Sequence, residues 1–339
     1  MTGATLQRIA IVCDPAHAAA PWRVARTLGP DPARALEGRP PEEVARLVPR
    51  VFNLCGAAHG FAAARALGLP AVADTLAMMR ESVRDHALAI LHGWPTLLDG
   101  APDRAALRAL ARPGEDGARA ITTALVGAPL ADHDFGTLTG AELDAWLVAG
   151  DTATARILAR LRRLDPAEGR AGLPELGAVD ILRALSARLA PDAGPSGEAA
   201  PAHRETGALG RVAATPLFAG LIAHEGPSLF VRLLARLADL LALLRAPPPA
   251  WPESPPGLGL AEAARGLLGH AARVEAGRVT HYRILSPSTW NLTPGGLLDR
   301  AFAALSPSPD APLLARFLLS ALNPCVPVTL DFQGARADA

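Results

Sequence analysis

The chain has 339 residues, half of them hydrophobic, and its 33 basic residues balance its 33 acidic ones. This neutral balance excludes the broadly basic surface that binds nucleic acid or an anionic membrane. All 33 basic residues are arginines, so Schiff-base and P-loop chemistry, which need lysine, are excluded. Three cysteines are too few for a disulfide framework and indicate a reducing compartment. We expect a cytoplasmic globular protein with one domain over residues 1–339.

No targeting or membrane-spanning segment is predicted. The first five residues lack a basic region, and the apolar run that follows is too short for a signal peptide. The most hydrophobic stretch, 228–244, contains Arg232, Arg236 and Asp239 on one helical face, opposite a face of leucines. Charges at that depth exclude a membrane span. The pattern predicts an amphipathic core helix instead.

The N-terminal region begins with a strand and continues with helices. An apolar run predicts a short strand over 7–13, and a turn-rich connection follows over 29–41. Two helical patterns lie within 41–67. Further helices are predicted over residues 72–91, 103–111, 114–126, 139–149, 152–164, 179–189 and 313–322. Asp74 or Thr75 is the expected N-cap of the first of these.

Two segments indicate mobile or irregular loops, and a third indicates a hairpin. Residues 190–203 are rich in Ala, Pro, Gly and Ser, and 246–257 contain six prolines in twelve residues. Alternating residues over 272–284, with a turn at Ala276-Gly277, predict a β-hairpin. The expected fold is mainly α, with a small β element near the C-terminal third.

Cys55 and His59 are the first candidate site residues. A helix that begins near Gly56 would place Cys55 at its N-terminus, where the dipole and free N–H groups favour a thiolate. His59, four residues on, would face the same side. The alternative is a buried structural cysteine beside an unrelated histidine.

Cys325 is the second candidate, because Pro324 and Pro327 hold the backbone around it extended and fix the direction of its thiol. It is either a metal ligand or a small hydrophobic residue. Cys55 and Cys325 are not the clustered pairs of a structural zinc site. Cys13, on the apolar strand, is assigned to packing.

Four segments together resemble the large subunit of nickel–iron hydrogenases. That family has R-x-C-G-x-C-x-x-x-H, then A-P-R-G-x-L-x-H before a hairpin, P-[ST]-T-W-N after it, and a C-terminal D-P-C-x-x-C-x-x-H. Here the matching segments occur in the same order at 50–59, 263–270, 287–291 and 323–331. Asp85-His86 also resembles the family's D-H motif on a helix. The resemblance covers most of the chain and implies a similar fold.

The departures from these motifs affect the metal ligands. Phe52 and Val328 stand where two of the family's four cysteines belong, and no R-x-E-G-H segment is found. The last motif also has Asn323 and Asp331 in place of aspartate and histidine. The resemblance leaves Cys55 at a bridging position and Cys325 at a terminal one. We therefore expect no nickel and no hydrogen turnover.

The remaining positions imply a site for the iron half of the cofactor, an Fe(CN)₂CO fragment. Thiolates of Cys55 and Cys325 are suitable soft ligands for iron, with their sulfurs under about 5 Å apart. Arg265 and Ser288 match the family positions that donate hydrogen bonds to the cyanides, and Pro287 and His59 accompany them. Alternatively, Arg265 forms an ion pair with a nearby acid.

Other matched residues have open assignments. His59 and His86 either support the metal ligands or are satisfied core histidines. Trp290 is expected to be a buried structural residue, and Asn291 to cap the turn.

This combination resembles an accessory paralogue of the large subunit, most closely the HupK-type hydrogenase expression/formation proteins. The implied role is to hold or protect the Fe(CN)₂CO fragment, with a small maturation chaperone and the large-subunit precursor as partners. No proteolytic maturation is expected. The alternative is a cofactor-free mimic of the large subunit that binds chaperones or hydrogenase subunits. A residual redox enzyme or hydrogen sensor would need nickel.

Overall fold

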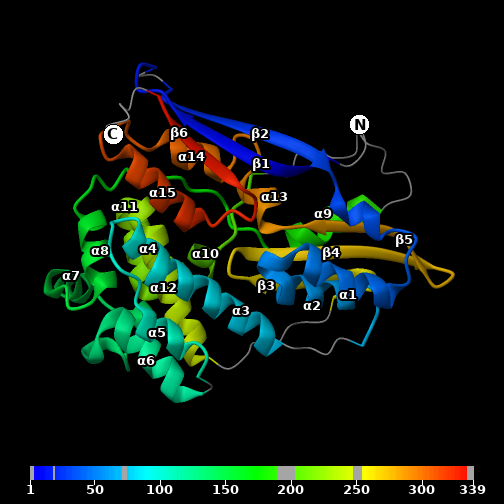
Figure 1. Ribbon diagram of the computed structural model, residues 1–339, viewed down its shortest axis with the longest axis horizontal. Coiled ribbons are helices and arrows are strands. Elements are labelled where there is room, and N and C mark those ends of the chain that lie inside the picture. Colours follow the sequence, from blue (N-terminus) through cyan, green and yellow to red (C-terminus); the bar gives the residue numbers. More distant parts are fainter. Residues whose placement is uncertain are drawn as a thin grey trace.

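The computed structural model describes residues 4–17, 20–70, 75–112, 114–189, 203–246 and 254–333. These residues form a helical body that is accompanied by a pair of three-stranded sheets (Figure 1). Most of the predicted loops 190–203 and 246–257 lies outside the described residues. The described residues 254–257 contain no helix, as the prolines predicted. The mainly α fold with a small β element is confirmed.

The first sheet joins the two ends of the chain in the order β2-β1-β6. Strand β1 (Ala4–Cys13) pairs antiparallel with β2 (Trp22–Pro30) and parallel with β6 (Val328–Phe332). Only β1 was predicted, because β2 carries arginines and β6 is short. Cys13 is fully buried, which confirms its packing role. Strand β6 fixes the segment just before it, which contains Cys325.

The second sheet is an antiparallel meander of β3 (Leu258–Ala263), β4 (Gly266–Glu275) and β5 (Arg278–Leu285). The turn at Ala276-Gly277 confirms the predicted hairpin. Strand β3 was missed because both faces of the sheet are covered, so β3 lacks polar alternation. Helix α2 (Gly56–Ala66) packs on one face and α9 (Ala178–Leu189) on the other.

Most predicted helices are confirmed to within a few residues. The other helices of the described residues are α1 Pro41–Val51, α3 Thr75–Leu88, α4 Trp94–Thr96, α5 Arg104–Ala109, α6 Glu115–Val126, α7 Gly140–Ala149, α8 Ala153–Arg162, α10 Ala208–Val212, α11 Pro216–Glu225, α12 Leu229–Arg245, α13 Pro287–Asn291, α14 Leu297–Ala303 and α15 Ala311–Leu322. Short helical turns lie at η1 Pro32–Leu36, η2 Asn53–Cys55, η4 Ala128–Leu130 and η5 Phe135–Thr137.

The helix predicted over 72–91 differs at its C-terminal end. It does not stop before Gly93 but continues through a π-helical turn, η3 (Ala89–Gly93), into α4. Glycine is tolerated inside the helix here, and the proposed N-cap Asp74 lies outside the described residues. The continuation brings Trp94 into the core.

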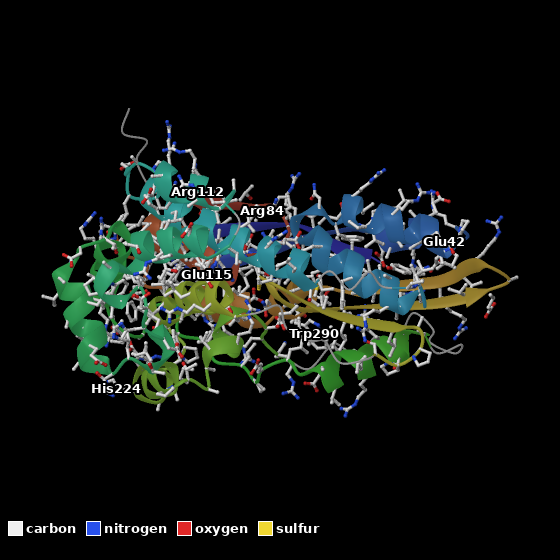
Figure 2. The ribbon with its side chains drawn as sticks, turned by 90° about the horizontal axis from the view of Figure 1, so that it is seen from below. Glu42, Arg84, Arg112, Glu115, His224 and Trp290 are labelled. Carbon is white, nitrogen blue, oxygen red and sulfur yellow. The ribbon has the colours of Figure 1, made fainter. Side chains whose placement is uncertain are left out.

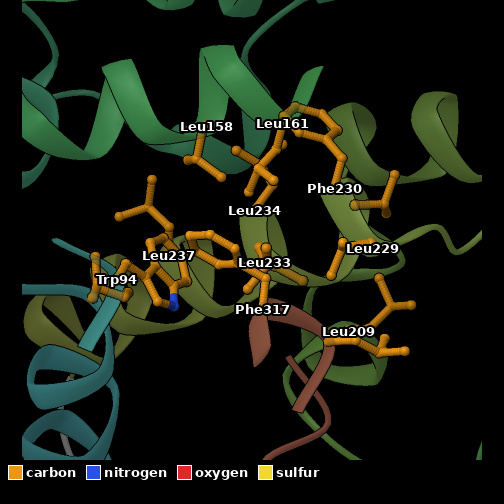
Figure 3. Packing of buried hydrophobic residues seen from close by; sticks show 14 of the residues in the cluster. Trp94, Leu158, Leu161, Leu209, Leu229, Phe230, Leu233, Leu234, Leu237 and Phe317 are labelled. Carbon is orange, nitrogen blue, oxygen red and sulfur yellow. The ribbon is translucent and has the colours of Figure 1, made fainter. Parts of the chain in front are cut away.

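The core surrounds α12. Figure 3 shows Phe230, Leu233, Leu234 and Leu237 of this helix among side chains of α8, α10 and α15 and Trp94 of α4. The charged face of α12 is buried as well, since Arg232, Arg236 and Asp239 are each at most 5% exposed. Buried charges require partners, and one of these partners, Asp85, also pairs with Arg265 of the candidate site.

Candidate functional site

Arg265 projects from a tight turn between β3 and β4. Gly266, the next residue, has φ +122°, and an added Cβ would meet Thr206 Oγ1 at 2.5 Å, so this turn requires glycine. Arg265 Nη1 donates to the Leu54 carbonyl at 3.1 Å and to Cys55 Sγ at 3.2 Å. Two segments that are 210 residues apart therefore meet at one guanidinium.

Cys55 precedes α2, as the sequence predicted, but it does not have the environment of a thiolate. The carboxylate of Glu81, on α3, accepts the Ala57 and Ala58 N–H groups and so occupies the helix N-terminus. Cys55 is 5% exposed, in an apolar cluster. Burial raises the pKa of its thiol to about 11, although Arg265 acts in the opposite direction. In the free protein Cys55 therefore fits the alternative of a buried structural cysteine, not a thiolate at the helix end.

Cys325 contacts the other matched donor, Ser288. The Cys325 thiol donates to Ser288 Oγ at 2.7 Å, and the Cys325 backbone N–H donates to the same oxygen at 3.1 Å. Pro287 begins α13 and places Ser288 in its first turn. Because Ser288 Oγ accepts both bonds, its own hydrogen is left to donate.

The fold thus brings Cys55, Cys325, Arg265 and Ser288 together. Cys325 is close enough to Cys55 to contribute to the raised pKa of that thiol, and both thiols act on Arg265. Among the described residues, no group of three or more His, Cys, Asp or Glu is arranged to hold a metal ion. An iron bound here would have the two thiols as its protein ligands and would need to bring its other ligands with it.

Asp85 also belongs to the candidate site, and the sequence did not reveal its contacts. Its carboxylate pairs with Arg265 Nη2 at 3.0 Å and Arg236 Nη2 at 3.1 Å and accepts a hydrogen bond from Asn323 Nδ2 at 2.7 Å. Burial alone would raise the pKa of Asp85, but the two arginines hold it below its ordinary value. The ion-pair alternative for Arg265 is therefore present. Asn323 supplies a donor where the family's aspartate would add a second carboxylate.

His59 takes part in a different contact from the one expected. Its Nδ1 lies 2.8 Å from His270 Nε2, and His270 Nδ1 lies 2.7 Å from the Tyr282 hydroxyl. Burial lowers the pKa of His59 to about 4, so the ring is neutral. Phe52 packs on His59 with ring centroids 4.9 Å apart, so an aromatic ring fills the position of the missing cysteine. His270 lies on β4, before the predicted hairpin begins, and Tyr282 lies on the paired strand β5.

His86 is a satisfied core histidine. Its Nε2 donates to Asp239 at 2.8 Å, and its Nδ1 accepts from Arg236 Nε at 3.1 Å. Burial lowers the pKa of His86 and would raise that of Asp239, but Arg211 and His86 hold the pKa of Asp239 well below its ordinary value. Arg211 completes the cluster with two bonds to Asp239. These contacts extend the polar network from Arg265 into α12.

Trp290 is buried, as expected, and Figure 2 shows it well inside the molecule, whereas Glu42 and His224 lie at the periphery. Asn291 does not cap its own turn. Its side-chain oxygen accepts the Thr206 N–H at 3.0 Å, and its amide donates to the Thr206 carbonyl at 2.7 Å. Asn291 therefore holds the segment that packs against Gly266, and so supports the turn that carries Arg265.

Comparison with known proteins identifies the family to which this chain belongs. The chain is 38% identical to the hydrogenase expression/formation protein HupK of Rhodobacter capsulatus, over 89% of this chain and 91% of that protein. It is 30% identical to the hydrogenase expression/formation protein HoxV of Cupriavidus necator, over 90% and 91%. The chain belongs to the HupK/HoxV family of hydrogenase expression/formation proteins. The expected resemblance is confirmed.

Broader comparisons agree with this family. The model of the nickel-dependent hydrogenase family matches residues 192–301. A chain in the crystal structure of an NAD⁺-reducing [NiFe]-hydrogenase in the H₂-reduced state superposes with a TM-score of 0.53 at 18% identity, covering 90% of this chain and 92% of that one. This chain therefore shares the fold of that hydrogenase chain. Within the described residues, no helix is both long and apolar enough to cross a membrane.

Proposed function

We propose that this protein is a non-catalytic accessory factor in hydrogenase maturation that holds the Fe(CN)₂CO fragment as cargo. The supporting observation is that Arg265 and Ser288 each contact one of two thiols, Cys55 and Cys325, that come from opposite ends of the chain. Two soft sulfur ligands with a guanidinium and a hydroxyl beside them fit an iron whose own ligands are anionic acceptors. The names of the relatives support a role in hydrogenase formation.

The donors suit cyanide ligands. Arg265 Nη1 already points toward the sulfur of Cys55. Ser288 retains its own O–H hydrogen, and iron at Cys325 would displace the thiol proton that Ser288 now accepts. Charge-assisted bonds of this kind are worth about 1.5–3 kcal/mol each.

Cargo release is also consistent with the site. Because the pKa of Cys55 is about 11, metal binding at neutral pH must displace a proton from a buried thiol. That cost weakens binding, as a carrier that passes its cargo on requires. We infer that the cargo arrives from a small maturation chaperone and leaves to the large-subunit precursor. Nickel is not expected, because Phe52 and Val328 offer no donor atoms.

One observation favours the alternative, a cofactor-free mimic that binds chaperones or hydrogenase subunits. Arg265 is already paired with Asp85 and both thiols already have hydrogen-bond partners, so the two thiols do not need iron to be satisfied. Such a protein would still bind the large-subunit precursor but would carry no iron.

Infrared spectroscopy separates the two functions. The protein would be purified anaerobically from a host that contains the maturation machinery, and cyanide and carbonyl bands are expected. Cys55→Ala and Cys325→Ala should lose these bands, whereas Cys13→Ala, the matched control at the buried third cysteine, should keep them. Absence of bands from protein that still captures the large-subunit precursor would replace the carrier with the mimic.

A further inference from the structure

A cavity of about 20 Å³ lies beside Arg265, separate from the two thiols. Its polar lining residues include Glu205, Arg232, Arg236, Arg265, Asn291 and Asn323. This volume is enough for one water molecule or one monatomic ion and far too small for an iron carrying three diatomic ligands.

Two buried hydrogen-bond donors beside this cavity have no partner among the residues that the structure describes. Arg232 uses Nη1 and Nη2 on the Glu205 carboxylate and the Ala171 carbonyl, and Arg265 uses its two on Leu54, Cys55 and Asp85. The Nε–H group of each arginine remains unpaired and inaccessible. Such orphaned donors are rare and point to a ligand, because a buried donor without a partner loses its hydration without compensation.

The charges around the cavity favour an anion over water. Three guanidinium groups, those of Arg232, Arg236 and Arg265, line it. These three arginines form ion pairs with two carboxylates: Arg232 with Glu205, and both Arg236 and Arg265 with Asp85. Burial lowers the pKa of Arg236 to about 10, opposed by Asp85 and Asp239 and reinforced by the charges of Arg265 and Arg211.

The two unpaired groups at the cavity are both donors. The Asn291 side chain already bonds both backbone groups of Thr206, and both Glu205 oxygens already accept from Arg232. A water placed here would accept two bonds, but its own hydrogens would need acceptors. A monatomic anion needs donors alone.

We propose that this cavity is a binding site for a small monatomic anion of the chloride class, held by the Nε–H groups of Arg232 and Arg265. The anion completes the partners of Arg265: Nε on the anion, Nη1 on Cys55 and Nη2 on Asp85. It thereby fixes the guanidinium that faces the thiols. The site exists whether or not the iron cargo binds.

Unfolding by urea in sodium chloride and in sodium gluconate at equal ionic strength tests the proposal. The urea concentration at the unfolding midpoint should rise with the chloride concentration and, at high chloride, increase with its logarithm, because the ligand binds only the folded state. In gluconate the midpoint should not change. Ala321→Leu, which fills the cavity, should abolish the chloride dependence. Ala303→Leu, at an exposed position of α14, is the matched control and should keep it.

Diffraction from crystals of the wild-type protein grown in bromide gives a second readout that does not depend on any variant. An anomalous peak between the two Nε atoms is expected. A water without anomalous signal, together with equal midpoints in chloride and gluconate, would overturn the anion site.

Discussion

Arg265 links the Cys55 segment to Asp85, because one guanidinium contacts Cys55, the Leu54 carbonyl and Asp85. Asp85 has two further partners, Arg236 and Asn323. Removing Arg265 therefore does not leave Asp85 as an unpaired buried charge. Because Asp85 keeps two partners, a variant that lacks Arg265 can test hydrogen-bond donation to the cargo without a large loss of stability.

Arg265→Ala is expected to destabilise the iron-free protein by about 1–3 kcal/mol, which is less than the roughly 3–5 kcal/mol of a broken buried ion pair. In protein loaded with the iron fragment, the cyanide bands should shift and weaken. Urea unfolding and infrared spectra of the same variant measure both effects. Cyanide bands that keep their position and full intensity in this variant would show that Arg265 does not donate a hydrogen bond to the cargo.

The Cys55 thiol predicts a pH dependence of stability. The pKa of this thiol is about 11 in the folded protein and 9.0 for a free cysteine, which stands for the unfolded chain. Between pH 9 and pH 11 the unfolded chain has therefore lost a proton that the folded chain keeps. Stability should therefore be unaffected by Cys55 below pH 9 and should fall from pH 9 to 11, by about 1.4 kcal/mol per pH unit. Tyr282 acts in the same direction, so the measurement is the difference between wild type and Cys55→Ala. An equal slope in both proteins contradicts the buried neutral thiol.

At the scale of elements, α12 combines core packing with a buried charged face. Arg232, Arg236 and Asp239 all have ionic partners on other segments. The same helical face would be solvated in an ordinary amphipathic helix, and the sequence pattern does not distinguish the two cases. Two of these residues, Arg236 and Asp239, belong to the network of contacts that ends at Arg265.

Asp239→Asn should destabilise the protein by about 3–5 kcal/mol, because Arg211 and His86 would lose the charge that both contact. Asp132→Asn is the control, since its pair with Arg119 is 67% exposed on both sides and should be worth less than about 1 kcal/mol. Thermal melts of the two variants give the comparison. Similar losses in both would mean that the α12 network contributes no more than a surface pair.

Helix α2, which carries His59 and begins just after Cys55, packs closely on β3. A Cβ at Gly259 would meet the Ala62 carbonyl at 2.0 Å, so Gly259→Ala must push the helix off the sheet. We expect a loss of about 3 kcal/mol or more, and faster reaction of Cys55 with a thiol reagent. Gly140→Ala, where an added Cβ meets no atom within 4 Å, should be neutral. Unchanged Cys55 reactivity in Gly259→Ala would show that this contact does not position the thiol.

At the scale of the whole molecule, the sequence predicted most helices and the hairpin, since these depend on local periodicity and turn residues. It did not predict β3, whose two covered faces remove the alternation, or β6, whose pairing with β1 spans the entire chain. The resemblance brought Cys55, Arg265, Ser288 and Cys325 to one site. The partners Glu81, His270 and Tyr282 were missed, because side-chain contacts between distant segments leave no signal in a single sequence.

The central claim is that two thiols from opposite ends of the chain hold one iron. Iron K-edge X-ray absorption of the anaerobically loaded protein tests this claim most directly, because it counts the sulfur atoms bound to the metal. Two sulfurs at about 2.3 Å are expected in the wild type and one in Cys55→Ala and in Cys325→Ala, with two retained in Cys13→Ala. A loaded protein whose iron has no sulfur neighbour, or an unchanged sulfur count in either ligand variant, would contradict the account.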